Sequence, residues 1–128
     1  MGEGSEVTDP PVALIDLAAG MLERKDARRP GLWPRTSVLV ARQALEGTVA
    51  GYWQMKKISL ENCSMHAQLI CLREYLREGD LASRVAHAWA AMSRACHHHP
   101  YELTPTVDEI RNWMQPVWEL REVVLRGC

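Results

Sequence analysis

The sequence predicts an all-α fold, a four- to five-helix up-and-down bundle with short loops. Apolar residues recur at three- and four-residue spacing, and no segment shows the sustained alternation that is typical of a strand. Prolines, glycines and capping residues divide the chain at short intervals. A length of 128 residues and a hydrophobic content of 47% suit one compact domain with its own core.

The N-terminal part of the chain is expected to hold a short disordered stretch and then the first helix. Residues 1–9 are rich in glycine, glutamate and hydroxyl side chains, so we expect them to be disordered and residues 10–128 to form the single helical-bundle domain. Asp9 precedes two prolines, a pattern typical of an N-cap followed by a first helical turn. We expect this helix to run to about Ala27.

A second helix is expected after the segment RRPGLWP, residues 28–34, whose two prolines and glycine break the chain. Thr36 or Ser37 is the expected N-cap. One side of this helix carries large apolar residues at helical spacing. The opposite side carries small residues that allow a close approach of another backbone, so we expect the helix to pack on two sides: Ala44, Gly47 and Gly51.

The third and fourth helices follow in the middle of the chain. The third helix is expected to begin after Ser59 and to end at about Arg77. Its apolar residues are spread so widely around the helix that we expect it to lie in the centre of the bundle. Asp80 is the expected N-cap of the fourth, which spans about residues 80–98. An apolar stripe on the fourth helix is expected to face the core: Leu81, Val85, Ala88, Trp89, Met92 and Cys96.

The last helix begins with a recognisable cap. Thr106 and Glu109 have the spacing of a capping box, in which each side chain accepts a hydrogen bond from the other residue's backbone N–H. Pro116 is expected to kink or divide this helix, because its ring displaces the hydrogen bond to the carbonyl of Asn112.

Charge and cysteine usage limit the classes of function. The net charge of −1 is not that of a protein that coats nucleic acid, so any contact with RNA or DNA must be local. Four cysteines without a C-x-x-C pair predict reduced thiols. The chain shows neither a signal segment nor a membrane span, so we expect a cytoplasmic protein without a membrane partner.

The fourth helix is expected to carry a polar face. At 100° per residue, Arg94, His87 and His98 fall within about 40° of one another and nearly opposite the apolar stripe. This face therefore points away from the core. Ala90 and Ala91 lie between these polar residues and are small enough for a second surface to approach, which leaves a solvated face, a groove or a subunit interface as alternatives.

The segment RACHHHPYE, residues 94–102, concentrates the titratable side chains at the end of that helix. Pro100 disfavours helical geometry for His99, so the helix should end near His98 and leave His99 at its C-terminal end. The helix dipole there favours an imidazolium, whereas Arg94 opposes it. These opposed influences favour a histidine near neutrality, where acid–base catalysis is most efficient.

An arginine and a histidine without a metal or a nucleophilic side chain are what cleavage of RNA by its own 2′-hydroxyl requires. The substrate supplies the nucleophile, the histidine transfers a proton, and the arginine stabilises charge on the phosphate. Because DNA lacks this hydroxyl, such chemistry would be specific for RNA.

The eight residues RACHHHPY have the spacing Arg-x4-His-x-Tyr, which resembles the motif of HEPN-domain ribonuclease toxins, a family of all-α bundles. The surrounding sequence is also similar to uncharacterised actinobacterial members. The resemblance implies that Arg94 and His99 are catalytic and that two protomers meet so that both motifs line one cleft. In the branch paired with a nucleotidyltransferase antitoxin, it implies that Tyr101 accepts AMP. The chain departs from the family pattern in having Ala95 where a polar residue is usual, and Pro100 before the tyrosine.

We therefore predict a metal-independent endoribonuclease that acts as a toxin or phage-defence effector, with no cofactor and RNA as substrate. His98 and His87 are predicted RNA contacts, and Tyr101 supports the site or is modified. The alternative is a non-catalytic HEPN scaffold that binds a protein partner or a nucleotide. A further alternative is a zinc site that recruits Cys96, His97 and His99, although neighbouring helical residues point about 100° apart.

Overall fold

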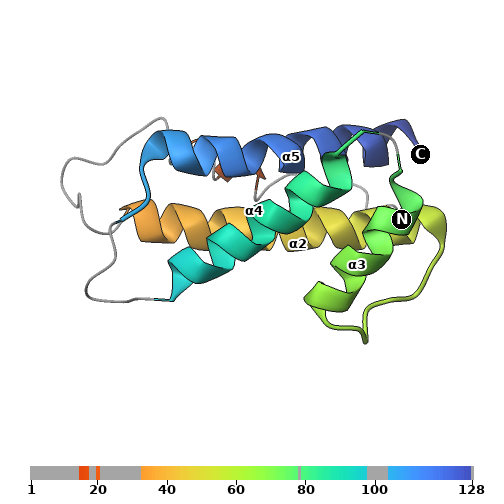
Figure 1. Cartoon of the computed structure of the whole chain (residues 1–128). Helices are drawn as coiled ribbons and strands as arrows, with labels where there is room; N and C mark the ends of the chain where they lie inside the picture. Colours follow the sequence, from red (N-terminus) through yellow and green to blue (C-terminus); the bar gives the residue numbers. More distant parts are fainter. Residues whose placement is uncertain (1–14, 18–19, 21–32, 78, 98–103, 128) are drawn as a thin grey trace, which may run out of the picture.

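The computed structural model describes residues 15–17, 20, 33–77, 79–97 and 104–127, and the elements within these ranges are helices joined by turns and loops (Figure 1). This confirms the predicted all-α helical bundle. Residues 15–17 and 20 are helical, within the range expected for the first helix. The expected disorder of residues 1–9 and the end of the first helix at Ala27 lie outside the described residues.

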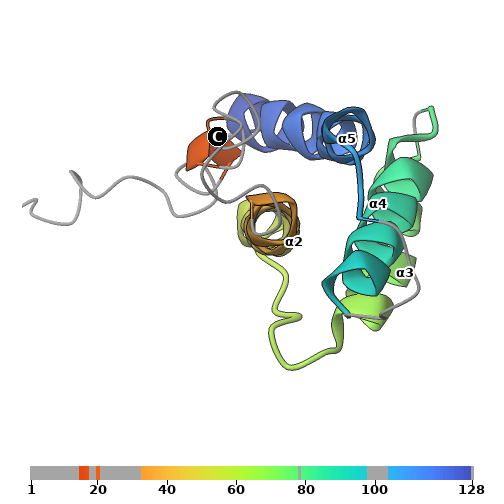
Figure 2. The ribbon, with the colours of Figure 1, turned by 90° about the vertical axis from the view of Figure 1, so that its left-hand side faces the viewer.

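The longer helices form one packed group. They are α2 (Trp33–Lys56), α3 (Met65–Tyr75), α4 (Leu81–Cys96) and α5 (Val107–Arg126). Helices α2, α4 and α5 pack against one another, and α3 packs on α4. Helix α4 runs in the opposite direction to α2 and α5 (Figure 1). Figure 2 shows α2 nearly end on, with α5 on one side of it and α4 with α3 on another.

Helix α2 is the centre of the core, and its buried residues lie on more than one side. Helix α2 packs on both α4 and α5, which confirms the expected packing on two sides. A Cβ atom added at Gly51 would lie 3.8 Å from Val124 Cγ1, an ordinary contact distance, so the approach of α5 at this position does not require a glycine. The helix begins at Trp33 rather than after Thr36 or Ser37, because Pro34 in a first turn lacks only an N–H that has no helical partner. The fully or nearly buried apolar residues of α2 include Val38, Ala41, Ala44, Leu45, Val49, Tyr52 and Trp53.

Helix α3 is peripheral, and the expectation that it is central was wrong. It begins at Met65, whereas the sequence predicted a start directly after Ser59. Ser64 is the N-cap of the helix, because its hydroxyl accepts a hydrogen bond from the Ala67 N–H at 3.1 Å. Its buried residues are Leu69 and Leu72. Ile70 on its outer side is 55% exposed. Tyr75 is 50% exposed, although its ring lies edge-on to that of buried Trp53 in α2, with ring centroids 5.3 Å apart.

The ends of α4 differ in detail from the prediction. Asp80 occupies the N-cap position, but its carboxylate does not cap the helix and instead accepts a hydrogen bond from Arg84 Nε at 3.0 Å. A charged partner explains this preference, since charge-assisted hydrogen bonds are stronger than neutral ones. The helix ends at Cys96, followed by His97 in an extended conformation, so it stops two residues before His98. Histidine is a weak helix former, and three follow in a row.

Helix α5 starts with the predicted capping box. The Glu109 N–H donates to the Thr106 hydroxyl at 3.1 Å, and the Thr106 N–H donates to the Glu109 carboxylate at 2.9 Å. Pro116 does not divide the helix, which continues to Arg126. Pro116 and the neighbouring Val117 are buried against the core, and this packing compensates for the missing backbone hydrogen bond. Within the described ranges, no helix has the length and apolar content needed to cross a bilayer.

Candidate functional site

The predicted polar face of α4 is present and points to solvent. Arg94 lies in the last turn of the helix, and Arg94, His87 and Ser83 are exposed. Residues at these positions share one side of a helix, since four and seven residues correspond to about one and two turns. The opposite side is buried and packs in the core: Val85, Ala88 and Met92. Arg94 and His87 therefore lie where the sequence predicted them.

Arg94 is available to a ligand as far as the described residues show. None of the acidic side chains in the described ranges forms an ion pair with it. Its carbonyl accepts the N–H of His97, which ends the helix. An exposed guanidinium without a carboxylate partner keeps its full charge and its hydrogen-bond donors for a phosphate.

The other predicted site residues fall in a part of the chain that the structure does not describe. His98, His99, Pro100 and Tyr101 all lie outside the described residues. The predicted meeting of Arg94 with His99 and Tyr101 therefore stays a prediction, and so does the RNA contact by His98. The structure does place His97 at the C-cap of α4, from which the chain leads directly into this segment.

One small residue of the predicted contact face was assigned wrongly. Ala91 is buried, with 6% of its surface exposed, whereas Ala90 is half-buried. Neighbouring helical residues point about 100° apart, so both cannot lie on the solvent side. Ala95, which follows Arg94, also packs against the core. Only Ala90 remains between His87 and Arg94 for a close approach by a second surface.

A polar network between α2 and α4 lies behind this face and was missed by the sequence analysis. The Trp89 Nε1–H donates to the Glu46 carboxylate at 2.9 Å, and Arg42 Nε lies 3.6 Å from the same carboxylate. Trp89 and Glu46 are 43 residues apart in sequence, so no local spacing signals their contact. The hydrogen bond from Trp89 attaches the second half of α4, which also carries Arg94, to α2.

Cys96 faces this network and is a poor candidate for a reactive thiolate or a metal ligand. Burial raises the pKa of its thiol, Glu46 raises it further, and Arg42 opposes both. The thiolate is the form that reacts and binds metal, so a raised pKa disfavours both roles at neutral pH. Across the described part of the chain, no three histidine, cysteine or acidic side chains gather to hold a metal. Cys63, Cys71 and Cys96 are free thiols, and Cys128 lies outside the described residues.

The other half of α4 is attached to α5 by an ion pair. Arg84 donates from two guanidinium nitrogens to the two carboxylate oxygens of Glu119, at 2.9 and 2.5 Å, and from Nε to Asp80. The hydrogen bond from Arg84 lowers the pKa of Glu119, although partial burial opposes this shift. Since Arg84 is occupied on both sides by acids, it is not a candidate for binding a further anion.

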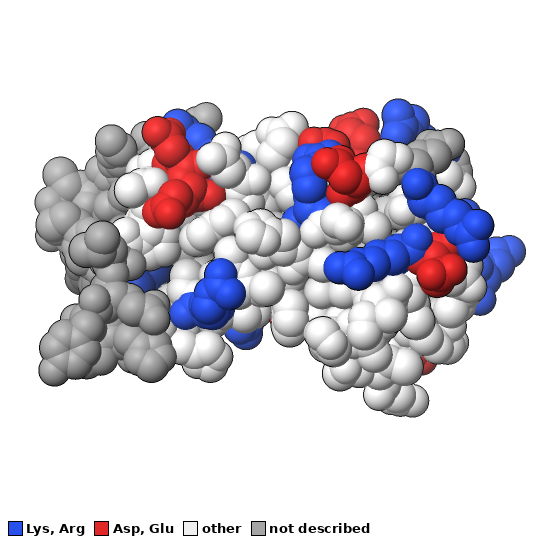
Figure 3. Space-filling view, in the orientation of Figure 1, with Lys and Arg blue, Asp and Glu red and all other residues white. Residues whose placement is uncertain are grey.

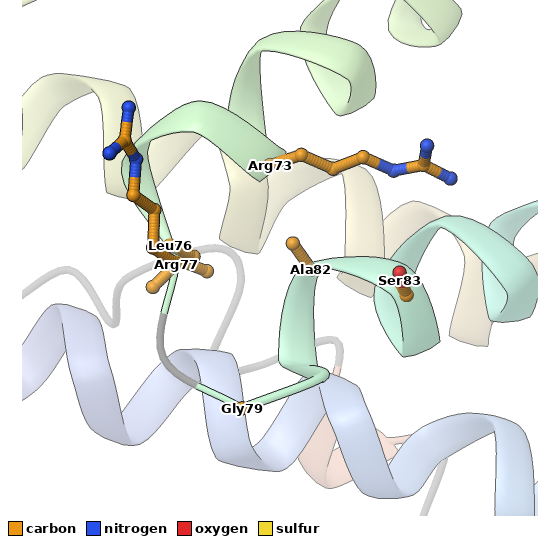
Figure 4. Close-up of a pocket in the computed structure, with 6 residues that line it drawn as sticks. All are labelled: Arg73, Leu76, Arg77, Gly79, Ala82 and Ser83. Carbon is orange, nitrogen blue, oxygen red and sulfur yellow. The ribbon is translucent and has the colours of Figure 1, made fainter.

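A hollow of about 240 Å³ lies where α3 ends and α4 begins, and sequence analysis did not indicate it (Figure 4). Two arginines, a glycine turn and the first turn of α4 meet there. The hollow opens at the end of α4 opposite to Arg94. Its lining residues are Arg73, Leu76, Arg77, Gly79, Ala82 and Ser83.

Comparisons with known proteins add nothing to this geometry. No protein-family model, no curated protein and no solved structure matches the chain. A functional assignment therefore depends on the residues themselves and on the resemblance of the motif.

Proposed function

We propose that this protein is a metal-independent endoribonuclease of HEPN type that acts as a toxin or phage-defence effector. The observation that carries the proposal is the position of Arg94, the first residue of the Arg-x4-His-x-Tyr motif. It is exposed in the last turn of α4 and free of described ion pairs, and the helix ends two residues later. An all-α bundle with a final helix soon after the motif also agrees with the family resemblance.

In the proposed reaction the ribose 2′-oxygen attacks the adjacent phosphorus while the bond from phosphorus to the 5′-oxygen breaks. His99 of one protomer takes the 2′-hydroxyl proton, and the departing 5′-oxygen receives a proton from His99 of the second protomer or from water. Arg94 stabilises the extra negative charge on the phosphate oxygens. The products are a 2′,3′-cyclic phosphate and a 5′-hydroxyl, and no metal or redox step is needed.

The proposed active form is a homodimer in which the two motifs line one cleft. The end of α4 supports this arrangement, because Arg94 is exposed in the last turn of the helix, where a second protomer can bring its own motif to the same cleft. In this arrangement His87 contacts RNA. Tyr101 orders the site or accepts AMP from a nucleotidyltransferase-type antitoxin, and such a modification would block the cleft.

The test is cleavage of structured RNA and transfer RNA by the full chain, with and without EDTA. We expect cleavage in both conditions, ends with a cyclic phosphate, and no cleavage of a strand carrying 2′-deoxyribose throughout. Arg94→Ala and His99→Ala should each reduce the rate by about a hundredfold or more, the usual contribution of a catalytic acid, base or charge stabiliser. Arg111→Ala is the matched control, because Arg111 is exposed on α5.

Full activity in Arg94→Ala or His99→Ala would remove these residues from the mechanism. Absence of cleavage by the wild type, together with a stable complex with a protein partner, would favour the scaffold alternative. In that case Ala95 in place of a polar side chain is the sequence feature that distinguishes this chain from active members.

A further inference from the structure

Two arginines line the hollow between α3 and α4, and among the described residues one forms an ion pair with an acidic side chain and the other does not. Arg77 Nε donates to the Glu74 carbonyl at 3.1 Å, and its guanidinium lies 3.4 Å from the Glu74 carboxylate. Arg73 has no ion-pair partner among the described residues. Figure 4 shows Arg73 extended alongside α4, towards Ala82 and Ser83, whereas Arg77 points away from them. Arg73 is therefore the charge that the hollow offers to a ligand.

The hollow is continuous with the face that carries Arg94. Ser83 lines the hollow and is exposed, and the same side of α4 continues through His87 and Ala90 to Arg94 at spacings of four, three and four residues. Arg73 and Arg94 thus mark the two ends of one strip of surface. Its middle is formed by His87 and Ala90.

The electrostatics of this strip favour an anionic chain. Helix α4 contains no aspartate or glutamate, although acidic residues make up 16 of the 128 residues in the protein. Figure 3 shows the face formed by α3 and α4, where lysine and arginine side chains lie near both ends, uncharged surface lies between them, and acidic side chains lie beside some of the cations. The acidic residues next to the hollow are paired, Glu74 with Arg77 and Asp80 with Arg84. A protein with a net charge of −1 attracts polyanions only where its cations are gathered in this way.

The length of the strip suits several nucleotides. Eleven residues separate Ser83 from Arg94, which corresponds to about 16 Å along the helix at about 1.5 Å per residue. Phosphates of one strand are spaced by about 3.4 Å along the axis of a stacked helix and lie farther apart in an extended single strand, so this distance spans at most about five nucleotides. An arginine at each end can therefore contact phosphates of the same strand.

We infer that the exposed side of α4 is a binding track for single-stranded RNA, in which Arg73 and Ser83 at the hollow hold a phosphate at most about five nucleotides away from the one held by Arg94. The inference depends on the proposed function, because that function makes RNA the anionic chain. It goes beyond that function by naming where the substrate runs outside the catalytic motif and which helix supplies the second contact.

The test measures binding separately from cleavage. A fluorescent 12-nucleotide 2′-O-methyl RNA cannot be cleaved by its own 2′-oxygen, and its affinity is measured by anisotropy at several salt concentrations. Arg73→Gln should weaken binding about three- to tenfold and reduce the slope of log affinity against log salt by about 0.7, the loss of one phosphate contact. Ser83→Glu should weaken it at least as much, because it places a carboxylate in the hollow.

The controls distinguish the loss of a positive charge at the hollow from the loss of a positive charge elsewhere on the protein surface. Arg111→Gln removes the same charge from an exposed position on α5 and should change the affinity less than twofold. Arg73 and Ser83 are exposed, so their replacement leaves the core unchanged, and a glutamate in the first turn of a helix is favourable. Circular dichroism of each variant verifies the fold.

The outcomes distinguish the binding track from the nuclease. Unchanged affinity and salt slope in Arg73→Gln and Ser83→Glu would overturn the track, even if cleavage depends on Arg94 and His99. Loss of affinity in both variants would support the track, even if the wild type cleaves no RNA. If Arg111→Gln weakens binding as much as Arg73→Gln, or if the wild type does not bind the RNA, the track is also overturned.

Discussion

The ion pair between Arg84 and Glu119 joins α4 to α5 and tests how the bundle is held. Two guanidinium nitrogens meet two carboxylate oxygens at 2.9 and 2.5 Å, in a geometry that favours a strong interaction. The side chains remain 37 and 38% exposed, however, so solvent screens the pair. A hydrogen bond between charged groups contributes about 1.5–3 kcal/mol, and exposed pairs contribute about 0.2–1 kcal/mol. We therefore expect about 1 kcal/mol for this pair.

The assay is a double-mutant cycle at pH 7 with Arg84→Met, Glu119→Met and the double variant, each unfolded in urea. Methionine keeps the apolar stem and favours a helix, and the contribution of Asp80 to Arg84 cancels in the cycle. The expected coupling free energy is about 1 kcal/mol. A parallel cycle on Arg77 and Glu74, whose side chains are 77 and 74% exposed, should give no measurable coupling.

The coupling between Arg84 and Glu119 should also depend on pH. Because the pKa of Glu119 is lower in the folded protein than in the unfolded chain, its stabilisation is present above the unfolded pKa of about 4.3. It should be lost as the pH falls through the lower, folded value. A coupling below about 0.3 kcal/mol at pH 7, or one unchanged at pH 2.5, would refute this account of the contact.

Two further changes test the helix ends and the core. Lys57 follows α2 with φ of 60°, a left-handed conformation that favours glycine. Lys57→Gly should therefore stabilise the protein by about 0.5 kcal/mol, whereas Lys57→Ala should not. A glycine variant that is less stable than the wild type would contradict this. Leu72 in α3 is fully buried, whereas Ile70 is 55% exposed. Leu72→Ala should lower the free energy of unfolding in urea by about 2–5 kcal/mol, and Ile70→Ala should lower it by less than about 1 kcal/mol. Equal losses in the two variants would show that α3 is not packed as described.

The fold class could be predicted because its signals are local. Helical spacing of apolar residues and the capping box at Thr106 and Glu109 depend on contacts within a few residues, and both are present in the structure. The start of α2 was placed too late because Pro34 was interpreted as a break, although proline is also compatible with a first turn. The central position expected for α3 failed because apolar content alone does not show which side meets the core.

The candidate site could be predicted only in part. Arg94 and His87 are exposed on one face, as the helical periodicity of α4 indicated. At the other end of α4, Asp80 and Arg84 are four residues apart, a spacing that indicates an ion pair within one helix. Glu119 lies 35 residues from Arg84, so this partner depends on how two helices pack and has no local signal. The residues that line the hollow all lie within residues 73–83, so it depends on the geometry of the turn between α3 and α4, which the sequence pattern did not indicate.

The proposed nuclease requires that Arg94 and His99 act together on one ribose phosphate. The rate of RNA cleavage in EDTA for the wild type, Arg94→Ala, His99→Ala and the double variant measures whether they do. We expect the wild type to leave 2′,3′-cyclic phosphate ends and each single variant to lose about a hundredfold or more in rate, with little further loss in the double variant because the two groups act as a unit. Wild-type rates in either single variant, or cleavage that EDTA abolishes, would contradict the account.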